Sequence, residues 1–112
     1  MIKSIVDVAV VVSDPKKSAE WYKEKLGLEV RENEDHWVTV APKGSDVVLH
    51  LCQSKPLEPG NTGIAFRVED LDKAYKEMAA KSVEFTVKPT KEEWGSYAMF
   101  KDPDGNVFWL LP

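Results

Sequence analysis

The chain has 112 residues, of which 43% are hydrophobic and 30% charged, a composition typical of a folded domain rather than a disordered segment. The net charge is −4, and lysines and arginines are interspersed with acidic residues, which argues against nucleic acid as a partner. No apolar run approaches the roughly 18 residues that span a bilayer, so we expect no membrane partner. A single cysteine, Cys52, and an N-terminal segment without a cleavage motif favour a cytoplasmic protein without a signal peptide.

The first half of the chain predicts a strand, a helix and three further strands. Residues 2–12 are β-branched and almost continuously apolar, as in a buried strand. Asp14 and Pro15 form a helix start, because a capping residue precedes a proline whose missing N–H is not needed there. Gly27 is expected to end this helix. The strands that follow are predicted at residues 28–33, 36–42 and 46–52.

The second half repeats this order of elements. Lys55–Asn61 contains prolines and a glycine and is predicted to be a linker. The expected elements after it are a strand at 62–68, a helix from about 69 to 81, and strands at 83–88, 95–100 and 106–111. The repeat places Asp14 on Asp70 and Lys17 on Lys73, which indicates a tandem duplication. We therefore expect a single domain, 1–112, with repeat units at about 1–55 and 60–112.

The expected fold class is α+β, with two tandem βαβββ modules. Each module forms a curved mixed sheet with its helix on the outer face, and the two sheets enclose a groove. A groove of this kind is the usual place for a small-molecule ligand.

Three segments resemble the paired half-motifs of the vicinal-oxygen-chelate superfamily, which includes glyoxalases, bleomycin-resistance proteins and dioxygenases. They are VDVAVVVSDPKKSAEWYKEKLGLEV, GIAFRVEDLDKAYKEM and FKDPDGNVFWLL. The first is similar to the family's first strand, helix start and L-G-L turn, and the last to its closing turn and strand. The resemblance implies the tandem fold, but the family holds both enzymes and drug-sequestering binders.

The resemblance also implies four metal-ligand positions. Carried over to this chain, they fall on Asp7, His50, Gly63 and Trp109. Glycine and tryptophan side chains do not ligate metals, and a catalytic ion usually needs about three protein ligands. We therefore expect no metal and no other cofactor; a divalent ion held by Asp7 and His50 is the alternative.

Alternation along the expected strands selects the side chains that face the groove. Asp7 interrupts an apolar strand and is either part of a ligand site or the ion-pair partner of Arg67. His50 is either a ligand-site residue or a hydrogen-bonded core histidine. The aromatic candidates near the groove, two of them beside the Lys/Glu-rich loop KPTKEEWGSY, line the groove or belong to the core or a dimer interface. The candidate ligand-binding residues are Asp7, Trp37, His50, Arg67, Trp94, Tyr97 and Trp109.

The function expected from these residues is metal-free sequestration of a small aromatic or cationic organic ligand. The family precedent is antibiotic resistance of the bleomycin-resistance type, in which a protein sequesters the drug. Stacking on the aromatic rings supplies affinity, Asp7 supplies charge selectivity, and the protein is expected to be a homodimer. An alternative is an enzyme of the glyoxalase or dioxygenase type, with a displaced metal or acid–base chemistry at His50. A further alternative is a regulatory or interaction module whose groove is filled by Trp109. No catalytic residue is identified.

Overall fold

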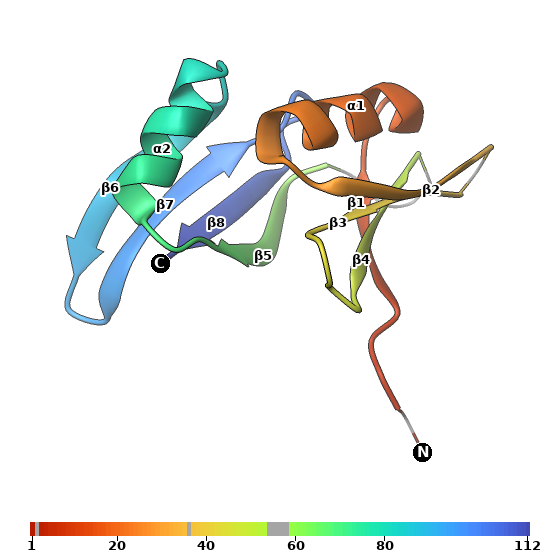
Figure 1. The fold of residues 1–112 in the computed structure, drawn as a ribbon, viewed down its shortest axis with the longest axis horizontal. Helices are drawn as coiled ribbons and strands as arrows, with labels where there is room; N and C mark the ends of the chain where they lie inside the picture. The colour runs from red at the N-terminus through yellow and green to blue at the C-terminus, as the bar shows by residue number, and fades with distance from the viewer. Residues whose placement is uncertain (2, 36, 54–58) are drawn as a thin grey trace. The chain divides into compact units, whose positions relative to one another are not determined.

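The chain divides into two compact units, Met1–Glu58 and Pro59–Pro112. The computed structural model describes residues 1–112 except 2, 36 and 54–58, so the first residue of the strand predicted at 36–42 and most of the predicted linker lie outside the described residues. Each unit holds one helix and one four-stranded mixed sheet (Figure 1). The α+β class and the tandem βαβββ order are confirmed, whereas the groove between the sheets stays a prediction.

Unit 1 contains the first helix and the first four strands. Its sheet has the order β1-β4-β3-β2, in which β1 is parallel to β4 and the other pairs are antiparallel. The bounds are β1 Asp7–Val11, α1 Pro15–Leu26, β2 Glu29–Glu34, β3 Trp37–Ala41 and β4 Val48–Cys52.

Helix α1 covers one face of the first sheet, because its apolar stripe packs on the strand residues that point toward it. Ala19 and Tyr22 are buried together with Val10, Val38 and Leu51 from the strands. The predicted caps are confirmed. The Asp14 carboxylate accepts a hydrogen bond from the Lys17 N–H at 3.2 Å, and Gly27 ends the helix with a left-handed φ of 71°.

Unit 2 repeats the arrangement with the order β5-β8-β7-β6, in which β5 is parallel to β8. Its core is a cluster of phenylalanines under the helix, and Phe100 and Phe108 are fully buried with ring centroids 5.6 Å apart. The Tyr75 ring reaches this cluster from α2 and meets Phe85 edge-on at 4.7 Å. The bounds are β5 Asn61–Arg67, α2 Leu71–Ala80, β6 Glu84–Glu92, β7 Gly95–Lys101 and β8 Val107–Leu111.

A buried polar network holds the turn between β7 and β8. The Asp102 carboxylate accepts hydrogen bonds from the backbone N–H of Asp104 and of Asn106, each at 2.9 Å. The Asn106 amide donates to the same carboxylate at 2.9 Å, and its oxygen accepts from the Gly60 N–H at 3.1 Å. The segment 102–106 therefore does more than form a turn, because Asn106 also links the chain just before β5 to the start of β8 by a hydrogen bond.

Two element predictions were wrong in extent. The first strand begins at Asp7, and Lys3 to Val6 are not in a strand. The segment expected as a loop, KPTKEEWGSY, forms the end of β6 and the start of β7, joined by a tight hairpin. Pro89 is tolerated in this strand because β6 lies at the sheet edge, where a missing N–H removes no essential ladder bond.

Candidate functional site

In unit 2, three aromatic side chains form a cluster on the sheet face opposite α2. Trp109 alternates with Phe108 and Leu110, which are buried on the helix side, so its ring projects from the other face. The ring centroids of Tyr97 and Trp109 are 5.1 Å apart, and those of Trp94 and Tyr97 are 5.3 Å apart. These rings, of Trp94, Tyr97 and Trp109, are hereafter the aromatic cluster.

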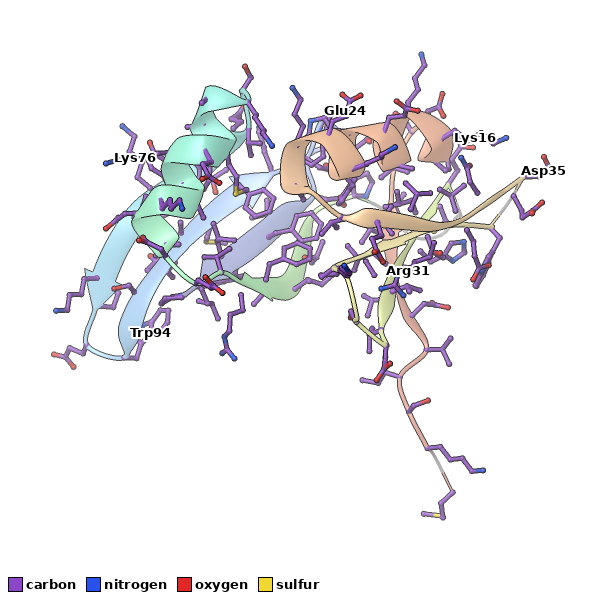
Figure 2. The ribbon with its side chains drawn as sticks, in the orientation of Figure 1. Lys16, Glu24, Arg31, Asp35, Lys76 and Trp94 are labelled. Atoms are coloured by element: carbon purple, nitrogen blue, oxygen red, sulfur yellow. The ribbon has the colours of Figure 1, made fainter. Side chains whose placement is uncertain are left out.

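The aromatic cluster has an exposed end at the β6–β7 hairpin. Figure 2 shows Trp94 at this hairpin, and its side chain is 63% exposed, so it does not belong to the core. Tyr97 and Trp109 are half-buried beside it. This face of the sheet therefore carries three neighbouring aromatic rings, of which Trp94 is exposed to solvent.

Arg67 lies on the same face of unit 2 as Trp109. It pairs with Leu111 in the parallel β5–β8 ladder, and Ala65, two residues earlier, pairs with Trp109. Arg67 is therefore a diagonal neighbour of Trp109 on the face away from α2, and it is exposed. The suggested ion pair between Arg67 and Asp7 joins residues of the two units and stays a prediction.

In unit 1, Trp37 and His50 form a ring pair on the face opposite α1. Their ring centroids are 4.1 Å apart and their planes are inclined by 42°. His50 pairs with Thr39 on one side and with Ala9 on the other, whereas its strand neighbours Leu49 and Leu51 are buried toward the helix. Trp37 is 38% exposed, so it is not a core residue, and His50 is half-buried.

Carboxylates flank this ring pair from both edges of the sheet. Asp7 is half-buried on β1 and lies on the face of Ala9 and His50. On β2, Glu32 pairs with Thr39, and Glu34 pairs with Trp37, so both side chains share the face of the ring pair. Neither Glu32 nor Glu34 is in an ion pair within the described part of the chain.

Sequence reasoning missed Glu32, Glu34 and Thr39 on this face. The signal for Thr39 was available, because it lies two residues after Trp37 on the same strand. The signal for Glu32 was not, because a bulge between Val30 and Glu32 shifts the register. Arg31 lies at this bulge (Figure 2). Its guanidinium donates to the Pro42 carbonyl at 2.8 Å and to the Ser45 carbonyl at 3.2 Å.

The residues at the family's four metal-ligand positions do not fit a metal ion in this chain. Asp7 and His50 share a face of unit 1, on adjacent strands, but their strand partners are Val48 and Ala9 rather than each other. In unit 2, Gly63 has no side-chain donor and Trp109 stacks in the aromatic cluster. Within the described residues, no three of histidine, cysteine, aspartate and glutamate gather as a metal site requires.

Two open hollows lie at the starts of the helices rather than at the predicted site residues. One has a volume of about 560 Å³ and is bordered by Asp14, Asp35 and Gln53 among others. The other has a volume of about 340 Å³ and is bordered by Asp70, Thr90 and Ser96 among others. Their equivalent places in the two units reflect the duplication, and neither includes a predicted ligand-binding residue.

Comparison with known proteins agrees with this architecture. The uncharacterized protein YetH of Bacillus subtilis is 38% identical to this chain, with 98% of each covered. The structure of TnmS3, an antibiotic binding protein from a Streptomyces species, superposes with a TM-score of 0.89 at 32% identity and covers 98% of this chain and 95% of its own. A glyoxalase/bleomycin resistance protein/dioxygenase superfamily member from Sphaerobacter thermophilus gives a TM-score of 0.87 at 32% identity, covering 97% and 96%.

The family model described as Glyoxalase/Bleomycin resistance protein/Dioxygenase superfamily matches residues 4–110. The chain therefore belongs to this superfamily, as its half-motifs predicted. In the described part of the chain, neither helix has the length and apolar character needed to cross a membrane.

Proposed function

We propose that this protein binds and sequesters a small aromatic or cationic organic molecule, and does so without a metal ion. The aromatic cluster is the observation that carries the proposal. Three rings with centroids 5.1 to 6.3 Å from one another, of which Trp94 is exposed, offer faces and edges to a planar ligand. A cationic group is attracted to the same rings through their quadrupoles.

The mechanism is capture by mass action. Stacking of one aromatic pair contributes about 0.5–1.5 kcal/mol beyond the area buried, so two or three such contacts account for useful affinity. Asp7, half-buried on the face of unit 1 opposite α1, is proposed to add a preference for a positively charged ligand. TnmS3, an antibiotic binding protein with the same fold, is a precedent for a binder rather than an enzyme.

Several finer properties belong to the same proposal. Capture of an antibiotic in the cytoplasm confers resistance when the protein is abundant relative to the drug. A homodimer supplies further apolar burial for a chain of this size, and Trp37 is a candidate contact for either the ligand or the second subunit. Arg67 is proposed to contact the ligand beside Trp109 in unit 2.

The test is a binding titration of chelator-treated protein, in which binding is measured by tryptophan fluorescence and by calorimetry. The probes are bleomycin, ethidium as a planar cation, and anthracene-9-methanol as a neutral ring. Trp109→Ala is expected to weaken binding about tenfold, the equivalent of one or two lost ring contacts. Trp21→Ala is the matched control, because Trp21 lies on α1 and contacts Tyr22 outside the aromatic cluster.

Three results contradict the proposal or its metal-free part. Equal losses for Trp109→Ala and Trp21→Ala, or no binding of any probe, overturn the role of the aromatic cluster. A titration with nickel, zinc, manganese and anaerobic ferrous iron examines the metal. Tight binding of one ion per chain that disappears in His50→Ala overturns the metal-free part of the proposal and favours glyoxalase or dioxygenase assays.

A further inference from the structure

Thr39 carries a buried hydroxyl with no hydrogen-bond partner among the described residues. Its side chain is 0% exposed, and its Oγ1 is the unpaired atom. Buried polar side-chain atoms almost always have a partner, because leaving one unpaired costs about 1–3 kcal/mol. Valine has nearly the same shape without this cost, so packing alone does not account for a threonine at this position.

The hydroxyl lies on the face of unit 1 opposite α1, not in the core under that helix. Its strand neighbours Val38 and Val40 are buried toward the helix, so the Thr39 side chain projects to the other face. There it stands between its two cross-strand partners, His50 on β4 and Glu32 on β2. The Trp37–His50 ring pair is next to it along β3.

Carboxylates lie beside this position, and the guanidinium of Arg31, next to Glu32 in the chain, is already paired with Glu29 at 3.0 Å. Glu32 is directly opposite Thr39, Glu34 is opposite Trp37, and both carboxylates are exposed without an ion-pair partner in the described residues. A ring pair, an unpaired hydroxyl and neighbouring carboxylates together match a positively charged group that also donates hydrogen bonds. A protonated amine joined to an aromatic ring has this chemistry.

We infer that Thr39 is a specificity-determining residue whose Oγ1 accepts a hydrogen bond from an N–H of a cationic ligand, with Glu32 supplying the charge attraction. This inference rests on the proposed ligand-binding function and names the group that the ligand carries. Because the hydroxyl is buried, the ligand reaches it by moving a neighbouring side chain. Trp37 lies two residues before Thr39 on the same face of β3, is exposed and contacts the His50 ring, so it is the neighbour that we expect to move. Such rotamer changes on binding are common.

Two ligands with the same ring and the same charge isolate the hydrogen bond. One is 9-(aminomethyl)anthracene, whose ammonium has N–H donors, and the other is the anthracen-9-ylmethyl trimethylammonium ion, which has none. Thr39→Val is expected to weaken binding of the first about tenfold and of the second less than about twofold. Thr39→Ser keeps a hydroxyl and restores affinity for the first ligand. Glu32→Gln weakens both ligands by a similar factor.

Thermal unfolding without ligand provides a second readout. Thr39→Val is expected to raise the melting temperature by a few degrees, because it removes an unpaired buried group while preserving shape. A more stable variant with selectively weaker ammonium binding supports the inference. A more stable variant with unchanged affinity for both ligands overturns it, and the binding function then stands.

The wild-type protein and Thr39→Ser provide a check that does not depend on the folding of Thr39→Val. If the wild type and Thr39→Ser each bind the ammonium ligand and the trimethylammonium ligand with equal affinity, the inferred hydrogen bond to Thr39 is overturned. Failure of either ligand to bind, together with failure of the neutral anthracene probe, overturns the proposed function itself. Binding of the neutral probe alone, lost in Trp109→Ala, preserves that function and overturns only the inference about Thr39.

Discussion

Replacing Asn106 by alanine removes the link between the β7–β8 turn and the start of β5. Asn106 is 1% exposed, and its amide donates to the Asp102 carboxylate at 2.9 Å while its oxygen accepts from the Gly60 N–H at 3.1 Å. In addition, the Val107 N–H donates to the Gly60 carbonyl at 2.8 Å. The variant leaves a buried carboxylate oxygen and a backbone N–H without these partners.

The magnitude follows from the two side-chain bonds. A hydrogen bond to a charged group contributes about 1.5–3 kcal/mol, and a neutral one about 0.5–1.5 kcal/mol. The expected loss in the free energy of unfolding is therefore about 2–4 kcal/mol, since the backbone bonds of the turn persist. At roughly 4 °C per kcal/mol for a chain of this size, the melting temperature falls by about 8–16 °C.

The assay is urea denaturation followed by circular dichroism, with Asn33→Ala as the matched control. Asn33 lies on β2 and is exposed, so its replacement is expected to change the free energy of unfolding by less than about 0.5 kcal/mol. A loss below about 1 kcal/mol for Asn106→Ala refutes the reasoning. That result means that water replaces both contacts or that the turn holds itself through Asp102 alone.

The remaining predictions concern the core, the helix caps and a surface ion pair, all measured by the same denaturation assay. Phe100→Ala is expected to cost about 3–5 kcal/mol, because the ring is fully buried among other phenylalanines; a cost below about 2 kcal/mol contradicts this packing. Asp14→Ala and Asp70→Ala each remove a cap and are expected to cost about 1 kcal/mol, adding in the double variant. Glu84→Gln is expected to cost less than about 1 kcal/mol despite the 2.8 Å contact with Lys101, because Glu84 is exposed; a larger loss shows an unexpected role for the pair.

The elements that sequence analysis predicted best are those with short-range signals. Asp14 and Gly27 bound the first helix because the chemistry of a cap involves residues within one turn of each other. Strand ends were less accurate, as the first strand shows. Its apolar run begins before Asp7, but pairing with β4 begins only at Asp7. Pairing depends on the partner strand, which a local pattern does not contain.

The candidate site also has features that the sequence predicted and features that only the structure showed. Alternation placed His50 and Trp109 on the faces away from the helices, and the structure agrees because the intervening residues are buried under those helices. The contacts of Trp94 with Tyr97 and Trp109 depend on the tight β6–β7 hairpin that the sequence had suggested as a loop. Whether all seven predicted residues line one groove stays a prediction.

The sequence by itself determined the duplicated order of elements, the helix caps, the family and the side of each strand that is apolar. All of these follow from the identity and spacing of neighbouring residues. Only the tertiary structure decided that Glu32, Thr39 and His50 lie in one row across three strands. That row depends on strand register and on the bulge beside Arg31, and register is set by contacts between residues far apart in the chain.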